Sequence, residues 1–140
     1  LLTARLASGR IVEGHGDLRA EHVCLTDPPR IIDCLEFDRD LRLVDPFEEI
    51  TFLGLDCARL GAPWIAGRLY QNLTEGLGDV PPGALVDFYM GFHACTRTRI
   101  ALRHLEDAEP KTPERWPVMA EAYMTAAWPA IERLSKSGGR

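Results

Sequence analysis

The stretch Gly14-His15-Gly16-Asp17-Leu18-Arg19-Ala20-Glu21-His22-Val23 decides the interpretation of the whole chain. It is polar and glycine-bearing, and it lies between two apolar segments of β-like composition. A second acidic stretch, Ile31-Ile32-Asp33-Cys34-Leu35-Glu36-Phe37, follows within the length of one hairpin. Two carboxylates at the ends of neighbouring strands are suited to a metal-assisted transfer site. The sequence therefore predicts that both stretches contribute to one polar site.

The spacing of apolar residues in the rest of the chain predicts mainly helices. Residues 22–26 and 30–34 are predicted to form two strands of a hairpin, because the segment Asp27-Pro28-Pro29-Arg30 between them is typical of a turn. A further extended piece is expected over 41–44, and residues 1–7 have helical spacing. Longer helices are expected over about 46–60, 63–77, 84–105 and 113–134, and Pro129 should kink or break the last one. The sequence predicts an α+β fold dominated by helices.

The composition of the 140 residues is that of one ordinary globular domain, 1–140, with 46% hydrophobic and 26% charged residues. No apolar run approaches the roughly 18–20 residues that span a membrane. The net charge of −5 argues against nucleic acid or an anionic membrane as the main partner. The charge is compatible with a cationic or neutral small substrate, and also with a merely solvated acidic surface.

The cysteines Cys24, Cys34, Cys57 and Cys95 have no CxxC spacing. All four sit in apolar surroundings, so they are expected to be reduced core thiols. This usage predicts a cytoplasmic protein.

Asp17 and Asp33 are the candidate reactive carboxylates. Asp17 could accept a proton from a hydroxyl nucleophile, which typically accelerates a reaction by about 10²–10⁴-fold, or it could be a turn residue that caps backbone amides. Asp33 ends a strand of two isoleucines that is expected to be buried, where an unpaired charge is costly. A divalent cation would compensate for that charge, and so would an ion pair to Arg39 or Arg42.

The neighbouring polar residues have two interpretations each. His22 could bind a metal or orient the loop through hydrogen bonds. Arg19 has the donors to hold a phosphoryl group, or it is simply solvated. Glu36 could extend the acidic site, bind a substrate amine or be an ordinary surface residue. His15 is expected to tie the loop to the core.

Three motifs in order resemble the aminoglycoside phosphotransferase-like kinases, a family with the protein-kinase-like fold. His15-Gly16-Asp17-Leu18 matches the catalytic loop, with His22 where the family has Asn. The strand ending in Asp33, followed by Glu36 and Phe37, matches the second motif, and Asp45-Pro46-Phe47-Glu48-Glu49-Ile50 matches the third. The resemblance covers about residues 10–106. It is closest to a bacterial branch whose members sometimes carry a separate P-loop ATPase domain.

The resemblance implies a kinase-like C-terminal lobe that phosphorylates a small-molecule hydroxyl with ATP and Mg²⁺, or with Mn²⁺ in its place. Asp17 would be the base, and Asp33 would bind the metal. His22 would be the second metal ligand or its structural substitute, and Arg19 would contact phosphate. Asp45 would brace the loop through backbone amides. Helices after Asp45 would form the acceptor pocket, with the candidates Glu36, Glu48, Glu49, Tyr89, His93 and Arg97.

The chain departs from the family pattern in two respects. An imidazole at His22 suits Mg²⁺ less well than an amide oxygen does. Residues 1–14 contain no glycine-rich hairpin and no strand lysine, so the nucleotide-binding N-lobe is expected to lie outside this chain, which would be inactive alone. Two alternatives stay open: an inactive kinase-like module that docks a partner such as a fused ATPase domain, and a metal-dependent hydrolase with ligands His15, Asp17, His22 and Asp33.

Overall fold

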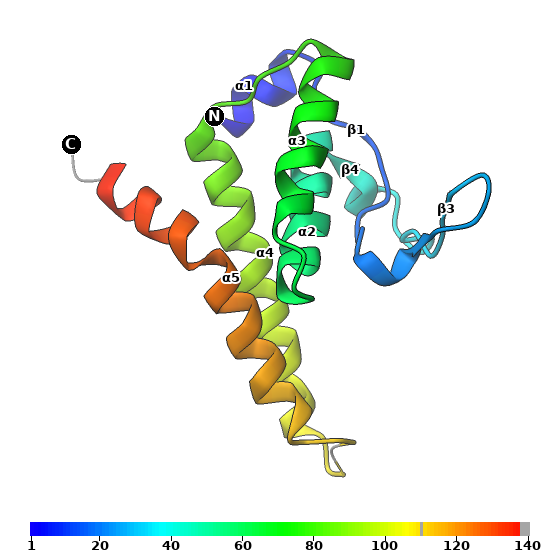
Figure 1. Ribbon diagram of the computed structural model, residues 1–140, viewed down its shortest axis with the longest axis vertical. Coiled ribbons are helices and arrows are strands. Elements are labelled where there is room, and N and C mark those ends of the chain that lie inside the picture. The colour runs from blue at the N-terminus through cyan, green and yellow to red at the C-terminus, as the bar shows by residue number, and fades with distance from the viewer. Residues whose placement is uncertain (110, 138–140) are drawn as a thin grey trace.

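The structure, a computed structural model, describes residues 1–109 and 111–137 and is mainly helical (Figure 1). The described chain contains the α-helices α1 (Leu2–Ala7), α2 (Pro46–Arg59), α3 (Trp64–Leu77), α4 (Gly83–Arg103) and α5 (Arg115–Ser137). Short 3-10 turns form η1 (Ala20–His22), η2 (Asp40–Arg42) and η3 (His104–Glu106). The predicted fold class, α+β with a dominance of helix, is confirmed. None of the described helices is long and apolar enough to cross a membrane.

The strands are short and form two separate antiparallel pairs. Strand β2 (Val23–Cys24) pairs with β3 (Arg30–Ile31), so the predicted hairpin is present with shorter strands. Strand β1 (Val12–Glu13) pairs with β4 (Leu43–Val44), which places the start of the polar loop beside the residues that precede α2.

The β2–β3 hairpin is not buried, contrary to the sequence-based expectation. Ile31 and Ile32 are 61% and 48% exposed. Figure 1 shows the hairpin extending away from the helices, although Val23 of β2 packs against the apolar cluster that includes Leu53 of α2. A run of isoleucines indicates a preference for burial, but the partner that would bury it has to come from elsewhere in the fold.

Helix α2 is the central element of the core. Asp45 caps its first turn by accepting a hydrogen bond from the Phe47 N–H (3.0 Å), and Pro46 occupies the first helical position. At Gly54 an added Cβ would lie 2.8 Å from the Cβ of Ala66, so glycine is needed for the close approach of α3. Three apolar clusters include a residue of α2: Phe47 with Leu85 and Tyr89, Leu55 with Ala94, Tyr123 and Ala127, and Leu53 and Cys57 with Leu18.

Helices α4 and α5 lie side by side as a long antiparallel pair (Figure 1). Helix α5 continues through Pro129 to Ser137, so Pro129 does not break it, although the axis changes direction toward the C-terminal end. A proline removes the hydrogen bond to the carbonyl four residues earlier. That residue, Thr125, is exposed, and its carbonyl can be solvated instead.

The cysteines are not all core thiols as predicted. Cys57 is buried and Cys24 is half-buried, whereas Cys34 and Cys95 are exposed; all four are free. Burial raises the pKa of the Cys57 thiol, with a further contribution from the charge of Asp56. Apolar neighbours in the sequence did not predict burial, because a thiol in a loop or on an outer helix face can be exposed beside them.

Candidate active site

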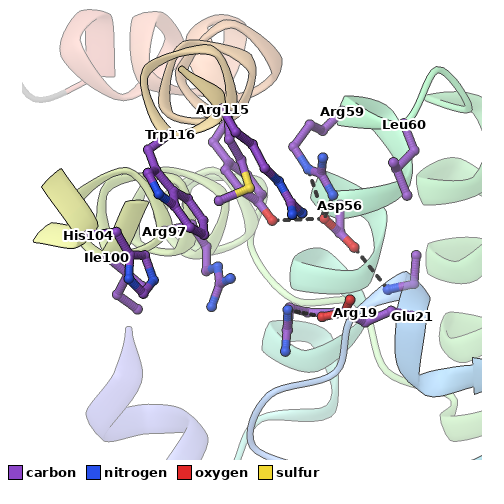
Figure 2. Close-up of a pocket in the computed structure, with 13 residues that line it drawn as sticks. Arg19, Glu21, Asp56, Arg59, Leu60, Arg97, Ile100, His104, Arg115 and Trp116 are labelled. Carbon is purple, nitrogen blue, oxygen red and sulfur yellow. Dashed lines mark hydrogen bonds and ion pairs between the residues drawn. The ribbon is translucent and has the colours of Figure 1, made fainter. Parts of the chain in front are cut away.

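The polar loop between β1 and β2 is fixed to α2 at three points. The carboxylate of Glu49 accepts hydrogen bonds from the backbone N–H groups of His15 (2.8 Å) and Gly16 (2.5 Å). Leu18 is 7% exposed and belongs to the cluster that includes Leu53 of α2. Asp56, labelled in Figure 2, accepts a hydrogen bond from the Ala20 N–H (3.0 Å). The loop is therefore positioned by a rigid helix.

The conformation of the loop requires glycine at position 16. Gly16 has φ +84°, which is unfavourable for residues with a side chain. A Cβ there would also lie 2.7 Å from the Leu41 carbonyl oxygen and 2.9 Å from the Leu35 side chain. This crowding fixes the backbone directly before Asp17.

Both ring nitrogens of His15 are used inside the protein. The Asp17 N–H donates to His15 Nδ1 (3.3 Å), so Nε2 carries the proton and donates to the Ile32 carbonyl (2.7 Å). The ring is 8% exposed and stacks on the ring of His22, with centroids 5.2 Å apart. His15 therefore links the loop to the hairpin and has no free nitrogen for a metal.

His22 is buried with one nitrogen available. Its Nδ1 donates to the Asp17 carbonyl (2.8 Å), which leaves the Nε2 lone pair as an acceptor. Arg19 Nη2 approaches that Nε2 at 3.1 Å, and Arg19 Nε donates to Asp17 Oδ2 at 3.0 Å. Asp33 Oδ2 lies 3.5 Å from the same Nε2. Asp17, Arg19, His22 and Asp33, singled out from the sequence, thus form one contiguous polar row.

Asp33 has a special backbone conformation and an open carboxylate. Its φ is +63°, and its side chain is 78% exposed. The alternative of an ion pair to Arg39 or Arg42 is wrong, because both arginines pair with Glu13, at 3.0 Å and 2.6 Å. These two arginines hold the pKa of Glu13 below its ordinary value, with the Arg42 hydrogen bond as the largest cause.

Asp45 is placed differently from the prediction. It is fully buried, and its carboxylate accepts hydrogen bonds from Arg5 (2.6 and 2.9 Å), Tyr89 (3.0 Å) and the Phe47 amide. The loop amides that it was expected to bind are held by Glu49, one turn later in α2. Asp45 therefore joins α1, α2 and α4. The hydrogen bond to Asp45 raises the pKa of the Arg5 guanidinium, and burial raises that of Tyr89.

Asp56 is an anchor that sequence reasoning missed. It is 3% exposed and accepts hydrogen bonds from Arg59 (3.0 and 2.7 Å), Tyr123 (2.8 Å) and the Ala20 amide. Burial alone would raise the pKa of Asp56, but these hydrogen bonds hold it below its ordinary value. Burial is also the main reason that the pKa of Tyr123 is raised. Asp56 thus connects the loop to α5.

A cavity of about 390 Å³, here called the Asp17 pocket, opens beside Asp17. Helices α2 and α4 contribute to its lining Glu48, His93 and Arg97, three of the residues named as acceptor-pocket candidates. His93 stacks on Phe52 (centroids 4.3 Å apart) and lies 3.5 Å from the Glu48 carboxylate. The predicted substrate residue Glu36 is exposed and does not line the pocket, and neither do Glu49 and Tyr89.

The polar row brings together two possible metal donors, His22 and Asp33. In residues 1–109 and 111–137 no group of three His, Cys, Asp or Glu side chains is arranged to hold a metal ion. With His15 also committed to internal hydrogen bonds, the four-ligand hydrolase site is not formed. His22 Nε2 and Asp33 Oδ2, which lie 3.5 Å apart, could supply two donors to a divalent cation. The carboxylate is the donor that Mg²⁺ prefers, whereas the imidazole suits softer divalent metals better.

Comparison with known proteins gives relatives without an assigned role. Uncharacterized proteins of Mycobacterium bovis and of two strains of Mycobacterium tuberculosis are 32% identical to the chain over 112 residues, or 79% of it. The chain spans 22% of the length of these curated relatives. No family model matches the chain. No solved structure matches it.

Proposed function

We propose that the chain is the kinase-like catalytic lobe of an ATP-dependent phosphotransferase that acts on a small-molecule hydroxyl. The observation that carries the proposal is the polar row from Asp17 through Arg19 and His22 to Asp33, with the Asp17 pocket at one end. A proton acceptor and a pair of metal ligands are the groups that phosphoryl transfer needs, because the protein mainly positions the reactants and neutralises charge.

Asp17 would act as the base. Arg19 binds its Oδ2, so Oδ1 can receive the proton of an acceptor hydroxyl placed in the Asp17 pocket. The hydroxyl oxygen would form a bond to the terminal phosphorus of ATP, the bond between that phosphorus and its bridging oxygen would break, and ADP would leave with the electron pair. The proton would remain on Asp17 until solvent removes it.

Arg19, His22 and Asp33 would handle the phosphates. His22 and Asp33 would hold Mg²⁺ or Mn²⁺, which when bound neutralises phosphate charge. Arg19 now donates to His22 Nε2, so this guanidinium would turn toward the transferred phosphoryl group when a cation binds. The nucleotide-binding lobe that completes such a site would lie outside these 140 residues. It would also cover exposed apolar side chains near the loop, such as Ile31 and Phe37.

The test is ATP turnover by the complete gene product, measured as ADP release with Mg²⁺ and with Mn²⁺ over a panel of hydroxyl compounds. Asp17→Asn should lower turnover by about 10²–10⁴-fold, because it removes the proton acceptor. Asp38→Asn makes the same change at an exposed aspartate in a different loop and should leave turnover intact. Equal turnover in the two variants would reject Asp17 as the base.

A second candidate function is an inactive kinase-like module that docks a partner, for example a fused ATPase domain. The observation in its favour is that Arg19 places a positive charge 3.1 Å from His22 Nε2, where a cation would bind. Calorimetric titration of the complete gene product with ATP and Mg²⁺ or Mn²⁺ separates the two functions. Nucleotide binding without any turnover would support the module, and Asp17-dependent turnover would reject it.

A further inference from the structure

A second and larger cavity adjoins the Asp17 pocket. It has a volume of about 530 Å³ and lies between the polar loop and the ends of α2, α4 and α5. Arg19, Arg59, Arg97 and Arg115 line it from these four parts of the chain, and Figure 2 shows them gathered around the same space. We call this cavity the arginine pocket. Residues that are far apart in the sequence converge here, so the charge is a property of the fold.

The arginine pocket is positive in a chain whose net charge is −5. Four arginines line the cavity, and the acidic residues among its described lining are Glu21 and Asp56. Asp56 is paired with Arg59 at 2.7 Å, and Glu21 accepts a hydrogen bond from Arg19. Both carboxylates are therefore neutralised by partners, and an excess of positive charge is left in the cavity.

Arg97 and Arg115 supply this excess. In the described parts of the chain neither one forms an ion pair with a carboxylate. They lie over aromatic rings instead, Arg97 at 5.9 Å from the centre of Tyr123 and Arg115 at 5.5 Å from that of Trp116. The Nε–H of Arg97 is buried and has no acceptor within residues 1–109 and 111–137. Buried donors without acceptors are rare, and an oxyanion is the ligand that would satisfy this one.

The arginine pocket is connected to the reactive end of the loop. Arg97 and Ile100 line both cavities, and Arg19 reaches from the arginine pocket to Asp17 at 3.0 Å. A molecule whose hydroxyl lies at Asp17 can therefore extend past Arg97 into the positive cavity. A cationic substrate would meet unpaired guanidinium groups on this path, which disfavours the alternative that Glu36 binds a substrate amine.

We propose that the arginine pocket binds an oxyanion of the acceptor, a phosphate or a carboxylate, so that the phosphotransferase acts on acidic hydroxyl compounds. The assignment of the bound anion to the acceptor molecule rests on the proposed function. The presence of an anion site rests only on Arg97, Arg115 and the cavity. The two parts can be tested separately.

The binding experiment compares three small probes with the complete gene product by isothermal titration calorimetry. Glycerol 3-phosphate carries a phosphate, glycerate carries a carboxylate, and glycerol carries neither. At least one of the two anions should bind, and glycerol should bind at least about 10-fold more weakly, because charge-assisted hydrogen bonds are lost. Repeating the titration with saturating ADP shows whether the anion occupies the nucleotide site.

Variants assign the binding to the pocket. Arg97→Gln and Arg115→Gln should each weaken anion binding by about 10-fold, and Arg97→Lys should retain part of it by keeping the charge. Arg115 is exposed, so its substitution should not affect folding, which circular dichroism checks. Arg99→Gln is the matched control, because Arg99 lies on the same helix as Arg97 and does not line the pocket.

Several results would overturn the inference. These are the absence of binding by both anions, equal binding by the Arg97→Gln, Arg115→Gln and Arg99→Gln proteins, or displacement of the anion by ADP. If Asp17-dependent ATP turnover were still observed, the proposed function would stand without this acceptor class. Arginine-dependent anion binding in a protein without turnover would instead overturn the acceptor assignment together with the proposed function.

Discussion

Two pairs of aspartates in this molecule have opposite surroundings. Asp45 and Asp56, before and near the end of α2, are 0% and 3% exposed, and arginine, tyrosine and backbone donors bind both carboxylates. The side chains of Asp17 and Asp33 are 27% and 78% exposed and have few partners. A buried carboxylate with fixed donors cannot change partners without loss of stability. An open one can take up a proton or a cation, which the proposed roles of Asp17 and Asp33 require.

The largest effect is expected from Asp45→Asn, which breaks the buried pair with Arg5. The substitution leaves the Arg5 guanidinium, 8% exposed, with weaker compensation from Asp79 at 2.7 Å. Removing one member of a buried ion pair typically costs about 3–5 kcal/mol. The free energy of unfolding, measured by urea denaturation, should fall by that amount.

The matched control for Asp45→Asn is Asp87→Asn. Asp87 also binds an arginine through both of its oxygens, but the Arg133 side chain is 61% exposed. An exposed pair of this kind contributes about 0–1 kcal/mol. A loss at Asp87 as large as that at Asp45 would contradict the distinction between an ion pair buried on both sides and one whose arginine is exposed.

The next largest effect is expected in the pH dependence of the free energy of unfolding, to which Asp56 contributes. Its pKa in the folded protein lies below the ordinary value, so Asp56 contributes stability that is fully present above about pH 4 and is lost as the pH falls through the folded pKa. Urea denaturation between pH 5 and pH 2 should therefore show a decrease in the free energy of unfolding that is smaller in Asp56→Asn. The exposed Asp38→Asn protein should keep the full dependence, and an equal slope in all three proteins would show that Asp56 is not its source.

The sequence predicted the elements whose signals are local. Pro46 and Gly61 delimit α2 closely, and Asp27-Pro28-Pro29 marks the hairpin turn, because these residues restrict or release backbone angles wherever they occur. The loop residues Asp17, Arg19 and His22 are close in sequence, so their proximity in space follows from the turn itself.

The sequence could not predict contacts that depend on how helices pack. Glu49 and Asp56 bind amides of the loop that lie more than 30 residues earlier, and their local sequence indicates only an acidic helix. The arginine pocket collects Arg19, Arg59, Arg97 and Arg115 from widely separated parts of the chain without a motif. The amide contacts and the arginine pocket could not be predicted before the fold was known. An aspartate such as Asp56 inside an otherwise apolar helix face does indicate that it has a buried partner.

The smallest effect on stability is expected from substitutions of Asp17 and Asp33. This small effect distinguishes them most clearly from Asp45 and Asp56. Asp17→Asn removes the negative charge that faces Arg19 in a partly exposed contact, and Asp33→Asn removes a carboxylate that is largely in water. Surface changes of this kind usually alter the free energy of unfolding by about 0.5 kcal/mol or less. Urea denaturation of both variants should match the parent chain within that margin.

If Asp17→Asn were as destabilising as Asp45→Asn, a loss of ATP turnover in that variant would reflect unfolding, and Asp17 would belong with the buried structural aspartates. A stable but inactive Asp17→Asn protein would leave the removal of a proton acceptor as the cause.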